Sequence, residues 1–271
     1  MAFAIDDLSN VIAHWSADQI GGLSDGDPVT TFPDSISSWS LSGSGTTRPL
    51  YRPTGINSLP SIEFDGTDDY LESASKSLTA SRVMVCFVAK VTNKNYNAFL
   101  YLSTSSGTPT FINPASRVGC YTYSTGQAST TTGDGSGNSN WLVNALIPNT
   151  TKFMLTSWHN RLTSGVRLNG LDYRITGGSS VPRSTNLSAT TVYANLGRCS
   201  LGGGFTQGHV SEIVLWSESE LCESWYIEGV LAHKFGITLP TSHPFYAAAP
   251  TSAPGSGGAV FDPLGRGALV I

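Results

Sequence analysis

Short segments rich in Val, Ile, Phe and Tyr, each bounded by Gly, Pro, Asn or Ser, recur along most of this chain. Such a pattern is typical of β-strands joined by turns. It predicts strands over residues 61–64, 82–91, 98–102, 118–123, 152–159, 166–168, 172–176 and 209–216. The chain is therefore expected to fold as an all-β protein.

Turn and loop residues divide these segments. Asn169-Gly170 lies between two of them, and Asn-Gly tolerates the two positive φ angles of a type I′ turn, so this dipeptide predicts a β-hairpin. Residues 124–140 and 41–47 consist mainly of Ser, Thr, Gly and Asn. We expect both stretches to be loops.

One helix is expected over residues 221–235. Ser217 and Glu220 have the spacing of a capping box, and Gly236 offers a C-terminal stop. Apolar residues cover much of the circumference of this helix, so we expect it to lie against a sheet.

Hydroxyl groups supply most of the polarity of this chain. Of 271 residues, 37 are Ser and 28 are Thr, whereas only 13% are charged. The 29 Gly and 14 Pro stay below the level that signals disorder. Six Trp, ten Tyr and eleven Phe supply enough apolar surface for one core. We therefore expect one domain over residues 1–246, followed by a linker and arm over residues 247–271.

Charge and hydropathy exclude several classes of partner. The net charge is −4 and no Lys/Arg cluster occurs, which argues against binding to nucleic acid. The first residues lack a basic region followed by an apolar run, and no later stretch is long and apolar enough for a membrane span, so we expect neither a Sec signal nor an anchor. The cysteines lie far apart without a C-x-x-C pair and are predicted to be free thiols rather than zinc ligands: Cys86, Cys120, Cys199 and Cys222.

The C-terminal arm combines a linker with an apolar end. Residues 247–258 have the Ala, Pro, Gly and Ser composition of a linker. The end of the arm is more apolar than a solvated tail requires, because of Phe261, Leu264, Leu269, Val270 and Ile271. We expect these residues to dock on a neighbouring subunit, with the arm adding a strand to an exposed sheet edge.

A series of motifs spans most of residues 11–246. They are residues 15–18 (WSAD), 48–71 (RPLYRPTGINSLPSIEFDGTDDYL), 169–170 (NG), 208–216 (GHVSEIVLW) and 231–236 (LAHKFG). In this order they resemble the laminin-G-like group of the concanavalin A-like lectin/glucanase jelly rolls, in the form common in bacteriophage and bacterial proteins; Ser58 stands where that group usually has Gly. The resemblance implies a two-sheet antiparallel jelly-roll sandwich with one C-terminal helix and an extended C-terminal arm.

No complete catalytic motif accompanies this resemblance. The glucanases of the superfold carry two or three acidic residues on one strand, and glycosidases need a pair of carboxylates. Glu63 and Asp65 begin such a pattern, but no second Glu follows at the required spacing. H-E-x-x-H and P-loop motifs do not occur, and the five His are scattered. The spacing G-x-S-x-G occurs only at residues 22–26 (GLSDG), where the sequence predicts neither the strand nor the helix that a nucleophile elbow requires on its two sides. We expect a protein that is not an enzyme.

Two kinds of binding site have candidate residues. Asp65, Asp68 and Asp69 form the densest acidic cluster and either bind calcium or cap turns; no other cofactor is expected. Aromatic residues beside polar loops are candidates for stacking on a sugar, although a role in the core is the alternative for each. These glycan-binding candidates are Trp141, Tyr121, Tyr123 and Trp158.

The function expected from the resemblance, the apolar arm and the charge-poor composition is adhesion. We expect a non-enzymatic bacteriophage virion protein, assembled in the host cytoplasm, that decorates the capsid or belongs to the tail. Its expected partners are other virion proteins or further copies of itself, with a trimer favoured, and host surface glycans. The alternative is a bacterial cell-surface or secreted carbohydrate-binding, lectin-like module. A third hypothesis is an enzyme whose acidic residues come from different strands.

Overall fold

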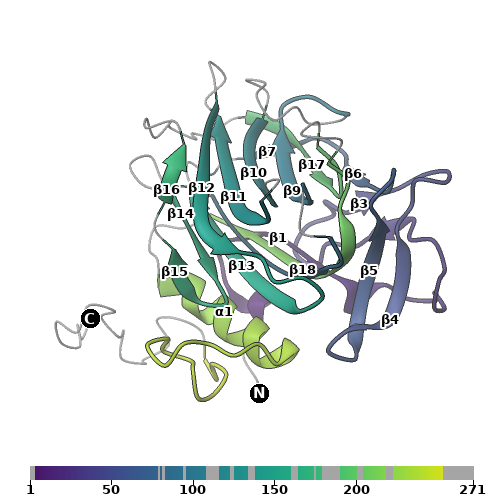
Figure 1. The fold of residues 1–271 in the computed structure, drawn as a ribbon. Coiled ribbons are helices and arrows are strands. Elements are labelled where there is room, and N and C mark those ends of the chain that lie inside the picture. Colours follow the sequence, from purple (N-terminus) through teal and green to yellow (C-terminus); the bar gives the residue numbers. More distant parts are fainter. Residues whose placement is uncertain are drawn as a thin grey trace.

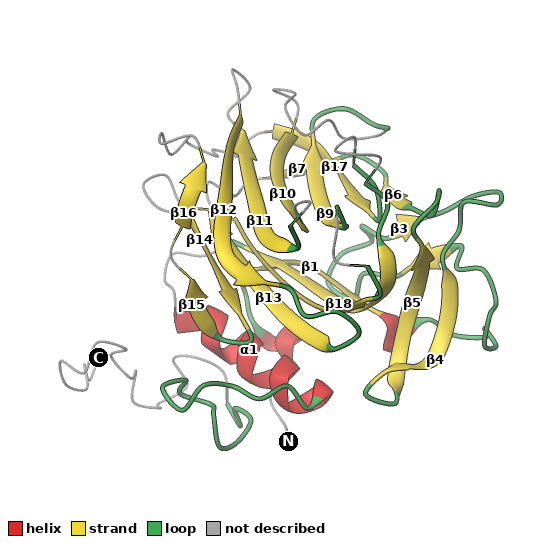
Figure 2. Cartoon of the chain, in the orientation of Figure 1, coloured by secondary structure: helices red, strands yellow, loops and turns green. Residues whose placement is uncertain are grey.

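Two antiparallel β-sheets form the layers of this protein (Figures 1 and 2). The computed structural model describes residues 4–78, 80, 83–93, 96–107, 116–122, 125–133, 138–159, 164–173, 175–178, 190–199, 204–217 and 222–252. Strands dominate this part of the chain, and the sandwich confirms the predicted jelly-roll class.

The first sheet has eight strands. In spatial order they are β15 (Leu171–Tyr173), β14 (Ser164–Leu168), β13 (Lys152–His159), β8 (Val83–Val91), β18 (Gln207–Trp216), β5 (Leu59–Asp65) and β4 (Leu50–Ile56), and β1 (Val11–Ser16) pairs with β18. Short 3-10 helices η1 (Ile5–Asp7) and η2 (Ala17–Gln19) flank β1.

The second sheet has ten strands. In spatial order they are β16 (Ile175–Gly178), β12 (Asn138–Leu146), β11 (Gln127–Gly133), β10 (Ser116–Thr122), β9 (Ala98–Ser103), β17 (Thr190–Leu196), β6 (Leu71–Ser73), β3 (Leu41–Ser42) and β2 (Thr31–Phe32), and β7 (Lys76–Leu78) pairs with β17.

Alternation along the central strand β8 explains how the eight-stranded sheet is covered on both faces. Val85 and Phe87 belong to the core between the two sheets, whereas Cys86 and Val88 belong to a second apolar cluster beneath the helix. Successive side chains of a strand point to opposite faces, so a continuous apolar run predicts burial on both. In the core, the ring of Phe87 stacks on Phe99 with 4.5 Å between centroids.

The helix α1 (Cys222–Phe235) covers the outer face of the eight-stranded sheet (Figure 2). Ile227, Leu231 and Phe235 are buried against that sheet, which confirms the expected contact. The helix ends at Gly236, whose φ of 59° suits the left-handed position that follows a helix. The residues of the predicted capping box at 218–220 lie outside the described part of the chain.

The predicted hairpin is confirmed. β14 and β15 pair on either side of Asn169 and Gly170, whose φ angles are 52° and 77°. Both positive values fit the type I′ turn that Asn-Gly favours.

The prediction of a loop at 124–140 was wrong, because this stretch contains β11 and the start of β12. The prediction of a loop at 41–47 was wrong only for Leu41 and Ser42, which form β3. In β11, the hydroxyl of Thr130 donates to the carbonyl of Gly119 at 3.1 Å and accepts from the Ser157 hydroxyl at 2.9 Å. β-Branched threonine suits a strand, and buried partners satisfy its hydroxyl. In β3, burial of Leu41 in the core outweighs the local turn composition.

Cys86, Cys120 and Cys199 are buried free thiols, as predicted, whereas the side chain of Cys222 lies outside the described part. Among the described residues, no helix has the length and apolar character needed to cross a membrane.

Candidate functional site

A row of cross-strand partners runs across the ten-stranded sheet at one level. Each residue is the register partner of the next, from β2 through β3, β6, β17, β9, β10 and β11 to β12. Its members, which we call the polar row, are Thr31, Ser42, Glu72, Asn195, Tyr101, Gly119, Thr131 and Asn140. Apart from Gly119, every member of the row is a residue with a hydroxyl, amide or carboxylate group.

The polar row lies on the face that points away from the core. In β17, Ala194 and Leu196 on either side of Asn195 belong to the core cluster. In β9, Leu100 and Leu102 flank Tyr101 in the same way. Cross-strand partners share a face of their sheet, so Thr31, Ser42, Glu72 and Thr131 lie on this outer face too.

Tyr101 occupies the middle of the row and lies over Gly119. A Cβ atom at Gly119 would be 2.4 Å from the Tyr101 ring and 2.7 Å from Thr131 Cγ2. The Tyr101 ring also stacks on Tyr121, with 6.1 Å between centroids and 28° between planes. Burial, followed by the neighbouring Cys199, raises the pKa of Tyr101 well above its usual value, so its hydroxyl stays protonated. Gly119 is therefore the position that lets the tyrosine lie flat on the sheet.

An ion pair neutralises the single carboxylate of the row. The Arg198 Nη2 atom lies 2.5 Å from Glu72 Oε2 and 3.3 Å from Asn195 Oδ1. The guanidinium also lies over the Tyr70 ring, 3.4 Å from its centroid, and the Gly107 amide donates to Glu72 Oε1 at 3.0 Å. The row consequently presents hydroxyl, amide and aromatic groups without net charge.

Within the described part of the chain, two donors of this network are buried without an acceptor. They are Asn195 Nδ2 and Arg198 Nε. Buried polar groups normally have a hydrogen-bond partner, and leaving one unpaired costs roughly 1–3 kcal/mol. The centre of the row therefore has two hydrogen-bond donors that the described contacts do not satisfy.

The exposed end of the row lies at the edge of the sheet. Thr31 and Ser42 are exposed and Glu72 is half-buried, whereas Asn195, Tyr101 and Thr131 are buried. A solute therefore reaches the row at β2 and β3.

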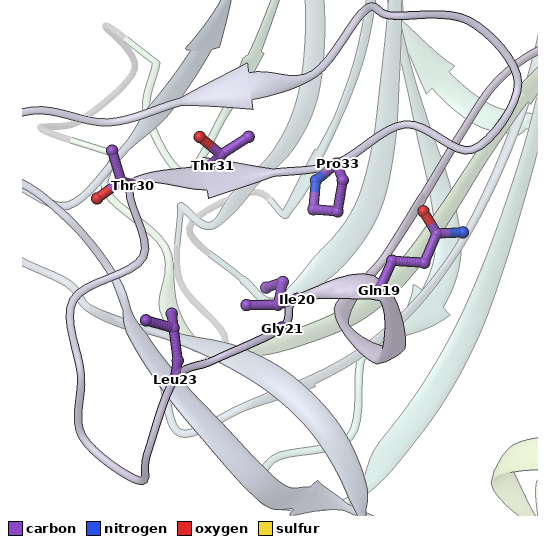
Figure 3. Close-up of a pocket in the computed structure, with 7 residues that line it drawn as sticks. All are labelled: Gln19, Ile20, Gly21, Leu23, Thr30, Thr31 and Pro33. Carbon is purple, nitrogen blue, oxygen red and sulfur yellow. The ribbon is translucent and has the colours of Figure 1, made fainter.

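A hollow of about 320 Å³ adjoins this exposed end (Figure 3). In the figure, the loop that carries Ile20, Gly21 and Leu23 faces the segment that includes β2. The lining residues are Gln19, Ile20, Gly21, Leu23, Thr30, Thr31 and Pro33. None of them carries a charge, and Thr31 belongs both to the hollow and to the polar row.

Arg48 fixes one hydroxyl of the hollow. Its Nη1 donates to Thr30 Oγ1 at 3.1 Å, and its Nε donates to the Gly45 carbonyl at 2.9 Å. A hydroxyl has one hydrogen and two acceptor lone pairs. With one lone pair engaged, the Thr30 hydroxyl keeps its hydrogen for another partner.

The predicted aromatic residues lie in different places. Tyr121 is buried on the outer face of the ten-stranded sheet, next to Tyr101. Trp158 is half-buried on the opposite side of the molecule, beneath α1, where the Arg167 guanidinium lies 5.3 Å from its ring. The backbone of Trp141 belongs to β12, but its side chain, like the whole of Tyr123, lies outside the described part. Tyr121 and Trp158 thus do not form one patch.

The acidic cluster occupies the turn between β5 and β6. Carboxylate oxygens of Asp65, Asp68 and Asp69 lie within 4.8 Å of one another. Asp65 Oδ1 accepts the amide of Thr67 at 2.7 Å, and Asp69 Oδ2 accepts the amide of Asp65 at 2.9 Å. Burial, with the charges of the neighbouring carboxylates, raises the pKa of Asp69 to about 6. These contacts are those of turn caps, while the calcium site remains a prediction.

Glu63, the first residue of the glucanase-like pattern, is held by cations. Its carboxylate lies 2.5 Å from Arg52 Nε and 3.7 Å from His209 Nε2. His209 Nδ1 lies 3.1 Å from the hydroxyl of Ser61, which is fully buried. The Ser, His and Glu are thus close together, but the hydroxyl has no access to a substrate.

Two buried charged clusters lie elsewhere, at the eight-stranded sheet. In the first, His14 lies between Asp6 (2.5 Å) and Glu212 (2.7 Å), and Lys234 contacts Glu212 at 2.5 Å. Although burial opposes charge on His14, the hydrogen bonds to these carboxylates raise its pKa to about 9. This cluster joins η1, β1, β18 and α1.

In the second cluster, Arg167 Nε lies 2.8 Å from Glu228 Oε1, and His243 Nε2 lies 3.2 Å from Glu228 Oε2. All three side chains are buried. This cluster fastens α1 and the segment after it to β14, and its role is structural.

The apolar residues of the C-terminal arm, from Phe261 to Ile271, lie outside the described part, and their docking stays a prediction. The polar row was not predicted. Its signal was the alternation in Leu71-Glu72-Ser73 and in residues 192–196, where polar and apolar side chains take turns. No local pattern, however, shows which residues of distant strands become neighbours.

Comparisons with known proteins support the architecture. No family model and no curated protein sequence matches the chain. Among solved structures, it is similar to domain 4 of AbnA, a GH43 extracellular arabinanase from Geobacillus stearothermophilus, in complex with arabinotriose. The TM-score is 0.52 at 13% identity, over 77% of this chain and 92% of that domain. At this identity the likeness shows a shared β-sandwich fold.

Two further similarities are weaker. Trypanosoma rangeli sialidase in complex with 2,3-difluorosialic acid matches with a TM-score of 0.49 at 12% identity, over 79% of this chain and 32% of the sialidase. The CBM40 of Ruminococcus gnavus IT-sialidase, bound to alpha2,3 sialyllactose, matches with a TM-score of 0.43 at 12% identity, over 58% of this chain and 90% of that module. The chain thus spans about a third of the sialidase. None of these proteins supports the virion role, which stays a prediction.

Proposed function

We propose that this protein is a non-catalytic carbohydrate-binding module that holds glycans at the exposed end of the polar row. The observation that carries the proposal is the polar row across the outer face of the ten-stranded sheet, whose accessible members are Thr31, Ser42 and Glu72. Hydroxyl and amide groups both donate and accept hydrogen bonds, which suits ligands that are themselves rich in hydroxyl groups. This corresponds to the lectin-like alternative of the sequence analysis.

The contacts of Glu63, Asp65 and Glu72 support binding without hydrolysis. Glycoside hydrolysis requires one carboxylic acid and one free carboxylate on either side of the bond. Glu63 is paired with Arg52, and Asp65 accepts the amides of its own turn. In the polar row, the carboxylate of Glu72 is engaged by Arg198.

The fold neighbour provides the first ligand to test. Domain 4 of the arabinanase, which shares the sandwich, was solved with arabinotriose. The full chain should therefore be tested with arabinotriose and on an array of neutral and acidic glycans, with affinities measured by calorimetry. Ser42→Arg places a long side chain on the exposed end of the row and is expected to lower affinity about tenfold or more, or 1.4 kcal/mol.

Thr54→Arg is the matched control, because Thr54 is equally exposed but belongs to β4 of the other sheet. Its affinity should equal that of the wild type. The proposal fails if no glycan binds, or if Ser42→Arg binds as tightly as Thr54→Arg. Release of reducing sugar that disappears in Glu63→Gln would instead establish the enzyme hypothesis.

A further inference from the structure

The hollow beside β2 has a size that suits one small ring. Its volume of about 320 Å³ lies at the lower end of ligand pockets, which span roughly 300–1,000 Å³. Because Thr31 lines the hollow and also begins the polar row, a ligand in the hollow has a direct path to Ser42 and Glu72. The hollow thus lies at one end of the polar row, where glycan binding is proposed above.

The lining has two chemical characters. Ile20, Leu23 and Pro33 provide aliphatic surface, while Gln19, Thr30 and Thr31 are the polar residues of the lining. Ile20 and Leu23 are half-buried and also pack against the core, which fixes their positions. A pyranose or furanose ring likewise has C–H groups on its faces and hydroxyl groups around its rim.

The hydrogen-bonding groups of the hollow favour an uncharged ligand. Arg48 donates to Thr30 Oγ1, so the Thr30 hydroxyl is oriented to donate to an acceptor such as a sugar oxygen. The guanidinium is held by this bond and by the Gly45 carbonyl, and Arg48 is not among the residues that line the hollow. No residue that lines the hollow carries a positive charge, and the nearest cation, Arg48, already donates to Thr30 and to the Gly45 carbonyl, so moving a carboxylate from water into this partly aliphatic site is costly.

We infer that the hollow formed by residues 19–23 and 30–33 binds one uncharged sugar residue, with a C–H face against Ile20, Leu23 and Pro33 and a ring or hydroxyl oxygen at Thr30. This inference rests on the proposed function, since it specifies where a bound glycan ends and which sugars it contains. The remaining residues of the glycan extend along Ser42 and Glu72.

Two substitutions test the site in the full-length protein. A Cβ atom at Gly21 meets open space, and its φ is not in the left-handed region, so Gly21→Phe fills the hollow without a collision at Cβ. We expect it to weaken binding of a neutral oligosaccharide about tenfold or more. Thr31→Val removes one hydroxyl with little change of shape and is expected to weaken binding about threefold to tenfold. Thr54→Val on the opposite sheet is the control and should leave affinity unchanged.

Ligand charge is the second arm of the experiment. Neutral oligosaccharides should bind about tenfold or more tightly than uronic acid oligosaccharides of the same length. The inference is overturned if neutral glycans bind but Gly21→Phe and Thr31→Val leave their affinity unchanged, or if the acidic series binds equally well. In those cases the proposed function stands, provided that Ser42→Arg still weakens binding. If the wild type binds no glycan at all, the proposed function and this inference fall together.

Discussion

The outer faces of the two sheets differ although both are built by the same alternation. On the eight-stranded sheet, Cys86 and Val88 of β8 and Val214 of β18 point outward and are covered by α1. On the ten-stranded sheet, the outward positions of β6 and β17 are Glu72 and Asn195. One outer face is thus buried by packing against α1, and the other carries polar groups at the edge of its sheet.

This difference shows where recognition is possible on such a sandwich. An apolar outer face needs a cover, and a helix supplies it at the cost of access. The polar outer face is not covered by α1: Thr31 and Ser42 at its edge face solvent, and Glu72 is paired with Arg198. The polar row therefore lies on the sheet that α1 does not cover, the hollow lies beside the edge strand β2 of that sheet, and the charged clusters around His14 and Glu228 lie on the sheet with the helix.

The largest effect on stability is expected from removing a charge beneath the helix, on the covered face. Arg167→Met removes the arginine partner of the buried Glu228 and leaves His243 Nε2, 3.2 Å from Glu228 Oε2, as its remaining contact in this cluster. An uncompensated buried charge costs about 3–5 kcal/mol, so we expect a loss of unfolding free energy of that size, measured by urea denaturation. Glycan affinity of the folded fraction should not change, since Arg167 and the polar row lie on different sheets.

The double variant Arg167→Met/Glu228→Leu is the control for this prediction. Replacing both members of a buried pair by apolar groups is often neutral, so most of the lost stability should return. A loss below about 1 kcal/mol in Arg167→Met would show that this cluster does not fasten the helix.

The covered face was predictable from the sequence and the polar one was not. The apolar run Val83–Val91 indicates a strand buried on both faces, and the helix over residues 221–235 provides its cover. The ion pair of Arg198 with Glu72 joins residues 126 positions apart, and this contact depends on the register of β6 against β17. Register follows from the whole core, so local patterns do not contain it.

The hollow escaped prediction for a related reason. Its residues come from two nearby segments, 19–23 and 30–33, but none of them belongs to a catalytic or metal-binding motif. These residues share only their position around the hollow, and the hollow exists because the loop after η2 lies opposite β2. By contrast, the Asn169-Gly170 turn was predictable because its conformation depends on two adjacent residues.

The second prediction concerns pH and the other charged cluster of the covered face. Because the pKa of His14 is raised to about 9 from 6.5, its contribution to stability is fully present below pH 6.5 and is lost as pH rises through 9. The shift corresponds to at most about 3 kcal/mol. The groups facing His14 are Asp6 and Glu212, and Lys234 pairs with Glu212.

Thermal unfolding measured from pH 6 to pH 10 checks this prediction, with His14→Gln as the comparison. The wild type should lose stability across the range, and the variant should be less stable at pH 6 with a flatter profile. Parallel profiles for the two proteins would contradict the assignment of the pH dependence to His14.

A smaller effect is expected from a methyl group on the polar face. Gly119→Ala places Cβ 2.4 Å from the Tyr101 ring, which must shift. Overpacking of this kind costs roughly 1–3 kcal/mol, measured by denaturation. Gly119→Ala/Tyr101→Leu should recover part of the loss, because the shorter side chain vacates the space over residue 119. If the double variant is no more stable than the single one, the ring does not explain the need for glycine.

The smallest effect is expected at the seam between the two sheets, where Asp69 follows β5 of one sheet and precedes β6 of the other. Its pKa is raised to about 6, so its contribution to stability is present below 3.8 and is lost as pH rises through 6. Asp69→Asn keeps an acceptor for the Asp65 amide and removes the charge. We expect it to raise the free energy of unfolding by about 1 kcal/mol at pH 7.5 and to have little effect at pH 4.

Calcium provides the sharper half of this test, because a bound cation would relieve the same repulsion among Asp65, Asp68 and Asp69. If the carboxylates act as turn caps, the melting temperature of the wild type is the same with calcium and with a chelator, and Asp69→Asn is more stable in both. A calcium-dependent rise in the wild type that Asp69→Asn abolishes would assign the cluster to the metal. A metal ion would then stabilise the turn that joins β5 of one sheet to β6 of the other, and the molecule would have a metal site in addition to its packed face and its proposed binding face.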